Sequence, residues 1–252
     1  MKKEDMFLLI PARAGSKGVK DKNSRNFCGK PLICHTIDSV INDFKRENII
    51  VSTNCPKLQD ICEERYGKNI TLHKRSDRAS SDQSPIMETI EEIRYLIRDV
   101  TENVSLCLLQ PTSPLRKKSD IHKAIDIHIK NNRGNLVSVT KAKHNCFPEK
   151  ILVKESESQA ISYIKDLSVT QRQKLKKQYL VRNGAIYISS LHDISKGLVR
   201  DESLFYEMPS WKSIDIDTVD DWRMAELIMN NQNKLEVTKS ASDKIQGYHG
   251  KI

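Results

Sequence analysis

The chain has 252 residues, a length compatible with one large domain that carries a smaller appendage. Hydrophobic residues make up 38% and charged residues 30%, with only 9 Gly and 8 Pro, which excludes a collagenous, low-complexity or disordered protein. The net charge of +9 is unevenly spread: residues 1–30 hold eight basic and three acidic groups, residues 165–182 six and one, and residues 201–236 three and nine. Patches of both signs suit a site for a polyphosphate with a metal at least as well as a groove for a nucleic-acid duplex.

No apolar run approaches the roughly 18 residues that a membrane helix needs. The short apolar stretch near the start is broken by Pro11 and Arg13 before the core of a signal peptide can form. We therefore expect a cytoplasmic protein with no membrane contact. The six cysteines form no C-x-x-C pair and no histidines cluster at zinc spacing, so we expect reduced thiols.

The first 140 residues alternate short β-rich runs with helical periods. The expected strands are residues 6–11, 49–53, 70–73, 104–109 and 136–140. The expected helices between them are residues 33–42, 57–66, 86–100 and 121–131. A repeated alternation of strand and helix predicts an α/β fold, a mostly parallel sheet with helices on both faces.

After residue 140 the pattern changes. Residues 141–182 are polar and basic with weak periodicity, which indicates an inserted lobe. Strand patterns resume at residues 185–189 and 212–217, a helix is expected over 219–229, and the residues after 236 are expected to form a loose tail. Ser84 before Pro85, Ser119 and Thr218 are candidate helix N-caps, the last with Asp221 in a capping-box arrangement.

Residues 11–23, Pro-Ala-Arg-Ala-Gly-Ser-Lys-Gly-Val-Lys-Asp-Lys-Asn, follow the first strand. Small residues let backbone N–H groups approach an anion, while Arg13, Lys17 and Lys22 supply charge for phosphate oxygens. The segment matches neither G-x-x-x-x-G-K-[ST] nor G-x-G-x-x-G. Its chemistry alone fits a solvated basic turn as well as a phosphate-binding loop.

Residues 213–217, Ser-Ile-Asp-Ile-Asp, carry two carboxylates. Strand periodicity predicts that Asp215 and Asp217 share one face, about 6 to 7 Å apart. Carboxylates so placed can hold Mg²⁺, which completes its octahedron with phosphate oxygens and water. The alternative is an amphipathic edge strand that presents both carboxylates to solvent.

Two further segments lie at expected strand boundaries. Residues 109–116, Leu-Gln-Pro-Thr-Ser-Pro-Leu-Arg, leave Gln110 and Thr112 at the carboxyl end of a strand, where open α/β sheets bind their ligands. A plain turn is the alternative for this segment. Residues 183–188, Asn-Gly-Ala-Ile-Tyr-Ile, are on chemistry alone a turn followed by a core strand.

Together with Lys22-Asn23 and Gly29-Lys-Pro-Leu-Ile, these four segments resemble, in this order, the acylneuraminate cytidylyltransferases, also called CMP-sialic acid synthetases. The resemblance covers about residues 6–230. It implies a Rossmann-like nucleotidyltransferase domain, expected at residues 1–236, with a small dimerisation lobe at about 141–182. The composition after Glu236 predicts the flexible tail at 237–252. The resemblance also implies transfer of CMP from CTP to the anomeric hydroxyl of a nonulosonic acid with release of pyrophosphate, Mg²⁺ as cofactor, and a homodimer.

The resemblance further implies roles for individual residues. The catalytic residues expected from it are Arg13, Lys22 and Asp217. Nucleotide contacts are expected from Ala12, Gly15, Ser16, Lys17, Asn23, Arg75 and Ser84. Sugar contacts are expected from Gln110, Thr112 and, across the dimer, Lys150 and Arg172, and the metal ligands are expected to be Asp215 and Asp217.

Several features leave the substrate and the proton acceptor open. Lys20 stands where the family commonly has proline. No histidine lies in the motifs, so we expect either that Mg²⁺ lowers the pKa of the sugar hydroxyl or that Asp217 or a water bound to the metal accepts its proton. Sialic, legionaminic and pseudaminic acids are all open as substrates. The nearest alternative is a cytidylyltransferase for an eight-carbon keto sugar or another sugar nucleotidyltransferase, and a remote one is a non-catalytic nucleic-acid-binding protein.

Overall fold

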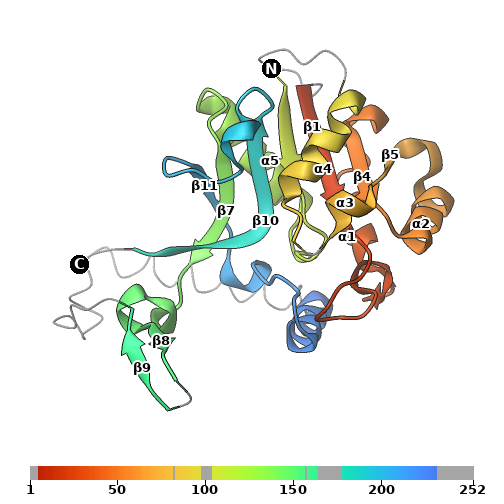
Figure 1. The fold of residues 1–252 in the computed structure, drawn as a ribbon. Coiled ribbons are helices and arrows are strands. Elements are labelled where there is room, and N and C mark those ends of the chain that lie inside the picture. The colour runs from red at the N-terminus through yellow and green to blue at the C-terminus, as the bar shows by residue number, and fades with distance from the viewer. Residues whose placement is uncertain (1–4, 82, 98–103, 157, 164–177, 232–252) are drawn as a thin grey trace, which may run out of the picture.

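The computed structural model describes residues 5–81, 83–97, 104–156, 158–163 and 178–231. At its centre is a seven-stranded sheet with the strand order β11-β7-β10-β6-β1-β4-β5 (Figure 1). The strands are β1 (Met6–Pro11), β4 (Ile49–Thr53), β5 (Thr71–Lys74), β6 (Ser105–Leu108), β7 (Leu136–Lys141), β10 (Leu180–Ser190) and β11 (Leu204–Glu207). Only β10 runs antiparallel to its neighbours, β6 and β7. The predicted mostly parallel sheet is confirmed.

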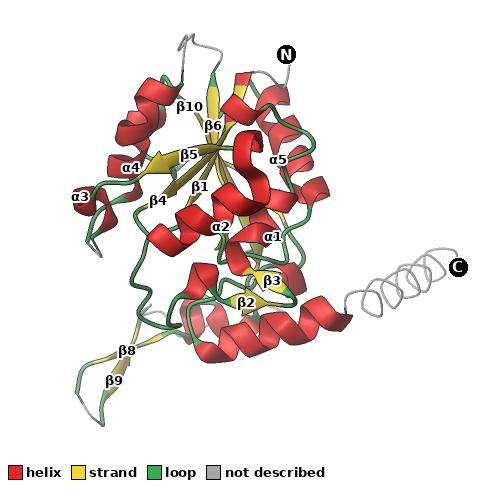
Figure 2. Ribbon diagram, turned by 90° about the vertical axis from the view of Figure 1, so that its right-hand side faces the viewer, coloured by secondary structure: helices red, strands yellow, loops and turns green. Residues whose placement is uncertain are grey.

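Helices cover both faces of the sheet, as Figure 2 shows. The α-helices are α1 (Leu32–Asp38), α2 (Pro56–Tyr66), α3 (Asp77–Ser80), α4 (Ile86–Ile93), α5 (Lys118–Lys130) and a helix at 219–231. Strand alternation sends Leu8 and Ile10 of β1 to a buried cluster with α1, α2 and α5, and Phe7 and Leu9 to a second cluster with α4. The two-residue period of β1 thus fixes which helices lie on which side.

The carboxyl ends of β1 and β6 lie at a topological switch point. From β1 the chain proceeds outward to β4 and β5 and then returns to pair β6 with the other side of β1. Connections therefore leave β1 and β6 in opposite directions, and this is where open α/β sheets form their ligand crevice. A third apolar cluster lies beside this point and joins the loop after β1, through Val19 and Phe27, to Ile216 and Trp222 near the chain's last described helix.

A small lobe extends from the far half of the sheet (Figure 1). The early residues of β10 pair with the end of β7, with Leu180 opposite Lys141, and the hairpin of β8 (Leu152–Lys154) and β9 (Ala160–Ser162) lies between these strands in the chain. This hairpin falls within the predicted insert at 141–182. Residues 164–177, with the predicted sugar contact Arg172, lie outside the described residues, as does the predicted tail at 237–252.

The prediction of a strand at residues 212–217 is wrong. A 3₁₀ turn covers Ser210–Lys212, and residues 213–217 pair with no strand. The Ile216 N–H instead donates to the Thr112 carbonyl at 2.8 Å, beyond the end of β6. The segment therefore crosses the carboxyl edge of the sheet and does not join it. The predicted alternation holds at the end of the segment, where Ile216 is fully buried and Asp217 is exposed, whereas Ile214 and Asp215 are both half-buried.

Two predicted helices are shorter than expected. The helix predicted at 33–42 ends at Asp38, and irregular turns follow. The helix predicted at 86–100 ends at Ile93 and continues as a 3₁₀ turn, Arg94–Leu96, while residues 98–100 lie outside the described part of the chain.

Of the three candidate N-caps, one is confirmed. Helix α4 begins after Pro85, so Ser84 is not its cap, and Ser119 lies inside α5. The capping box at Thr218 is present: its N–H donates to Asp221 at 2.8 Å, and the Asp221 N–H donates to the Thr218 hydroxyl at 3.2 Å.

Candidate active site

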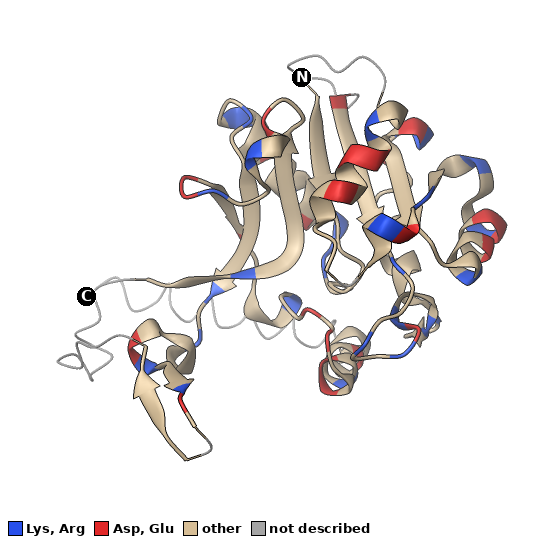
Figure 3. Ribbon diagram, viewed as in Figure 1, with Lys and Arg blue, Asp and Glu red and all other residues tan. Residues whose placement is uncertain are grey.

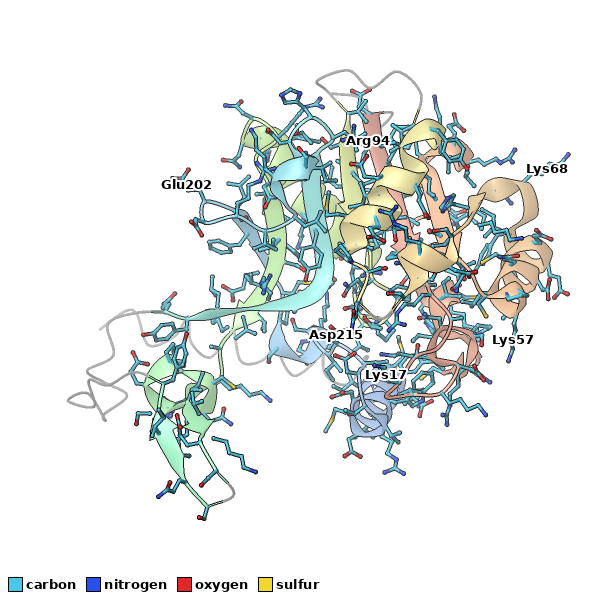
Figure 4. The ribbon with its side chains drawn as sticks, in the orientation of Figure 1. Lys17, Lys57, Lys68, Arg94, Glu202 and Asp215 are labelled. Atoms are coloured by element: carbon cyan, nitrogen blue, oxygen red, sulfur yellow. The ribbon has the colours of Figure 1, made fainter. Side chains whose placement is uncertain are left out.

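A cavity of about 560 Å³ opens at the carboxyl ends of β1 and β6. Four segments line it: the loop after β1, residues 75–86 after β5, residues 110–112 after β6, and the acidic segment 213–217. The predicted residues that line it are Arg13, Ser16, Lys17, Lys22, Asn23, Arg75, Ser84, Gln110, Thr112, Asp215 and Asp217. Figure 4 labels Lys17 and Asp215, which lie below the sheet, near the helix at 219–231. Segments about 200 residues apart in sequence thus meet in one cavity.

The remaining predicted residues lie elsewhere. Ala12 is buried and its N–H donates to the Ser52 carbonyl of β4 at 2.9 Å, so it anchors the start of the loop and does not line the cavity. Gly15, with φ of +75°, lines a small adjacent hollow of about 30 Å³. Lys150 is exposed on the lobe, in the 3₁₀ turn before β8, and does not line the cavity.

The loop after β1 interlocks with the acidic segment. A Cβ on Gly18 would lie 1.8 Å from the Asp217 carbonyl oxygen, so only glycine permits this approach. The buried Lys22 ammonium donates to the Ile216 carbonyl and, at 3.2 Å, to Asp217 Oδ1. Figure 3 shows Lys and Arg positions close to Asp and Glu positions where these segments meet. The cationic loop and the acidic segment therefore form one unit.

The cationic wall of the cavity contains unsatisfied polar atoms. Arg75 is buried, and its Nη2 donates to the Ala79 carbonyl. Burial lowers the pKa of Arg75, and the nearby charge of Arg13 lowers it further. Among the described residues, Arg75 Nε and Asn23 Oδ1 are buried without a hydrogen-bond partner. Buried polar atoms are nearly always paired, so these two are candidates for contact with a polar ligand.

The acidic wall contains one half-buried carboxylate, Asp215, and one exposed carboxylate, Asp217. Burial raises the pKa of Asp215, and a hydrogen bond from Thr112 opposes this increase. A Cβ on Gly184, whose φ is +73°, would lie 2.8 Å from Asp215 Oδ2 and 3.0 Å from Gln110 Oε1, so glycine is required there. The Asp217 side chain is 76% exposed. The exposed Asp217 carboxylate can thus exchange its present partner for a ligand more readily than the Asp215 carboxylate can.

The carboxylate pair fits a divalent cation that binds together with a polyphosphate. In the part of the chain that the structure describes, no three His, Cys, Asp or Glu side chains are grouped to hold a metal without a ligand's help. Asp215 Oδ1 is buried and has no hydrogen-bond partner among the described residues, which leaves an oxygen for coordination. Two carboxylates with phosphate oxygens and water are a ligand set that Mg²⁺ accepts.

Arg116 supports the site and was not singled out from the sequence. This buried guanidinium donates to the carbonyls of Gln110 at 3.1 Å and Ala185 at 2.6 Å and to the Thr36 hydroxyl at 2.9 Å. Burial lowers its pKa to about 10. It thereby ties the loop after β6 to β10 and α1. An arginine that ends a proline-rich strand terminus was the only signal for this role.

The fold and site define a nucleotide-binding α/β protein, because a cationic loop and a carboxylate pair converge at the switch point of the sheet. The family model described as cytidylyltransferase matches residues 7–235, and the chain belongs to this family. The resemblance seen in the sequence motifs is thereby confirmed. Cytidylyltransferases of this family generally use a divalent metal.

Curated relatives specify the family further. An N-acylneuraminate cytidylyltransferase of Streptococcus agalactiae serotype V is 34% identical over 222 residues, 85% of this chain and 51% of that protein. A CMP-N,N'-diacetyllegionaminic acid synthase of Legionella pneumophila is 32% identical over 239 residues, 90% of this chain and 97% of that protein. The chain spans about half the length of the streptococcal relatives it matches.

A solved structure shows the same fold. It is a CMP:2-keto-3-deoxy-manno-octonic acid synthetase complexed with CTP, with a TM-score of 0.64 and 16% sequence identity, covering 90% of this chain and 99% of that one. At this identity the likeness concerns the fold alone. None of the helices in the described residues is long and apolar enough to cross a membrane.

Proposed function

We propose that the chain is a cytidylyltransferase that transfers CMP from CTP to the anomeric hydroxyl of a nonulosonic acid and releases pyrophosphate. The observation that carries the proposal is the cavity in which Arg13, Lys22 and Arg75 face Asp215 and Asp217 at the carboxyl edge of the sheet. Curated relatives named for N-acylneuraminate and for N,N'-diacetyllegionaminic acid support a nine-carbon sugar of this kind.

The cationic wall would hold the triphosphate. The four negative charges of CTP are the main electrostatic obstacle, and displacement at the α-phosphorus needs in-line positioning and a stabilised leaving group. The positive charges of Arg13, Lys22 and Arg75 offset this negative charge. Lys17, in the loop after β1, contributes a further positive charge. Asn23, Ser16 and Ser84 supply hydrogen bonds to the nucleotide. The unpaired buried Arg75 Nε and Asn23 Oδ1 support these assignments.

Asp215 and Asp217 would hold the divalent cation, which we propose is Mg²⁺. When bound, such a cation neutralises phosphate charge and lowers the pKa of a coordinated hydroxyl. The buried, unpartnered Asp215 Oδ1 supports this role, because a free carboxylate oxygen in a buried position is costly unless a cation or a donor contacts it.

The chemical step forms one bond and breaks one at the α-phosphorus, and the proton of the anomeric hydroxyl is transferred to an acceptor. The anomeric oxygen bonds to the α-phosphorus, the bond from the α-phosphorus to the bridging oxygen breaks, and pyrophosphate leaves with that electron pair. No histidine is among the described residues that line the cavity, so the hydroxyl proton passes to Asp217 or to a water. Gln110 and Thr112, at the end of β6, contact the sugar.

The active form is proposed to be a homodimer, in which Lys150 and Arg172 from the partner's lobe approach the sugar carboxylate. Large apolar side chains on the described part of the lobe support an interface: Leu152, Ile161 and Tyr163 are 63%, 53% and 64% exposed. Sedimentation of active enzyme tests this, and an active monomer would contradict it. A cytoplasmic location stays a prediction.

A panel of substrates tests the proposed function. Pyrophosphate release is measured with CTP, UTP, ATP and GTP against sialic, legionaminic and pseudaminic acids and an eight-carbon keto sugar. Turnover is expected only with CTP and a nine-carbon acid. Turnover with the eight-carbon sugar alone would favour the nearest alternative. Salt-sensitive duplex binding without any turnover would favour the nucleic-acid alternative.

A further inference from the structure

The acidic segment, residues 213–217, pairs with no strand, so individual hydrogen bonds at its two ends help to hold it in place. At one end, the Ser213 hydroxyl donates to the Pro209 carbonyl at 3.0 Å and accepts from Asn183 Nδ2 at 2.9 Å. At the other end, the Ile216 N–H donates to the Thr112 carbonyl at 2.8 Å. Asp215 lies between these two anchors. The anchor at Ser213 therefore helps to determine where the Asp215 carboxylate lies.

Asn183 is buried and uses the full hydrogen-bonding capacity of its amide. Its Oδ1 accepts from the Ser138 hydroxyl at 2.6 Å and from the Ala185 N–H at 3.3 Å. Its Nδ2 donates to the Val139 carbonyl at 3.4 Å and to the Ser213 hydroxyl. The amide thus links β7 and β10 to the acidic segment. It is not among the residues that line the cavity, so its influence passes through Ser213.

The backbone around Asn183 explains why a side chain is needed here. The register of β10 against β7 shifts between Arg182 and Tyr187, so regular ladder bonds are interrupted at this point. Gly184, the next residue, brings the β10 backbone close to Asp215 Oδ2. The same irregularity therefore makes room for the carboxylate and supplies the amide that anchors its segment.

We propose that Asn183 is a positioning residue that, through the Ser213 hydroxyl, holds Asp215 in place to ligate the divalent cation. This rests on the proposed function. Partners beyond the direct ligands of a metal orient those ligands, and their loss typically weakens metal binding 10- to 100-fold. Asn183 and Ser213 contact neither the cationic loop nor Arg75 in any described hydrogen bond, so nucleotide affinity without metal should not depend on them.

The test uses Mn²⁺ as the probe and measures its binding to the enzyme with CTP but without sugar, from the electron paramagnetic resonance signal of free Mn²⁺. Ser213→Ala removes the hydroxyl and is expected to weaken Mn²⁺ binding about 10-fold. Ser213→Thr keeps the hydroxyl and is expected to restore it. CTP affinity in chelator, measured by calorimetry, is expected to stay within twofold.

Ser203→Ala is the matched control. The half-buried Ser203 hydroxyl also bonds to a buried asparagine, donating to Asn135 Oδ1 at 2.6 Å, but at the opposite end of β7. Its Mn²⁺ affinity is expected to equal that of the wild type. Equal affinity in Ser213→Ala and wild type, or a loss that Ser213→Thr does not restore, would overturn the role of Asn183. Asp215→Ala separates the two proposals, since unchanged Mn²⁺ binding in that variant would contradict the metal site itself.

Discussion

Gly18→Ala tests whether the contact between the cationic loop and the acidic segment is what aligns the site. The added Cβ would lie 1.8 Å from the Asp217 carbonyl oxygen and 3.0 Å from the carbonyl carbon. Real Cβ atoms essentially never approach closer than 3.0 Å, so relief of the oxygen contact alone needs about 1.2 Å of movement. Because both partners are backbone, either the loop or the acidic segment must move as a unit.

The magnitude follows from that displacement. A misplacement of about 1 Å at a site of positioned groups can reduce turnover roughly 100-fold. We therefore expect kcat/KM for pyrophosphate release to fall about 100-fold, which corresponds to about 2.7 kcal/mol of lost transition-state stabilisation. The free energy of unfolding should fall by about 1 to 3 kcal/mol, as is usual for overpacking.

Gly67→Ala is the control for the general cost of replacing glycine. Gly67 has φ of +46° at the end of α2, and no atom lies within 4 Å of its added Cβ. Its ψ of −117° lies outside the left-handed helical region, so we expect the alanine to lose about 1 to 3 kcal/mol of stability from backbone strain alone, with kcat/KM unchanged. If Gly18→Ala kept kcat/KM within threefold of the wild type, the reasoning from the close contact would be refuted.

Four other substitutions have defined expectations. Asp217→Ala and Lys22→Ala should each abolish pyrophosphate release while circular dichroism shows an intact fold, and normal activity in either would refute its assigned role. Arg116→Met leaves two backbone carbonyls without their donor, so urea unfolding should show a loss of about 2 to 5 kcal/mol, and a loss below 1 kcal/mol would contradict its bracing role. Burial lowers the pKa of His128 below its ordinary value of about 6.5, so below that pH the unfolded chain binds a proton that the folded chain does not. Stability should therefore fall as pH falls through this range, and His128→Gln should reduce the slope by up to about 1.4 kcal/mol per pH unit; an unchanged slope would contradict the assignment.

The parallel half of the fold could be predicted from sequence because its signals are local. Strands β1 and β4 were predicted at their observed bounds, since buried β-branched and leucine runs end at residues of a different kind, such as Pro11. The antiparallel direction of β10 could not be predicted in this way. It depends on the path of the inserted lobe between β7 and β10, and no periodicity in the strand itself records that path.

The site was predictable to the extent that its motifs follow strand ends. Gln110 and Thr112 were placed correctly because the carboxyl edge of the sheet follows from the topology. The burial of Ile216 and the exposure of Asp217 were predicted correctly, but the strand was not, because Ile216 is buried by a cluster of loop and helix residues and not by a neighbouring strand. The requirement for glycine at position 18 also could not be predicted from the sequence, because it arises from the backbone of Asp217, about 200 residues further along the chain.

Apolar packing, more than ion pairing, decides where the acidic segment lies. Burial of an isoleucine such as Ile216, which is fully covered beside Phe27 and Trp222, stabilises by about 1.5 to 3 kcal/mol. The ion pair between Lys22 and Asp217 contributes about 0 to 1 kcal/mol, because the carboxylate is largely in solvent. The apolar cluster, and not the ion pair, therefore holds the cationic loop and the acidic segment together. Lys22 and Asp217 can then break their contact with each other and bind a ligand without loss of the fold.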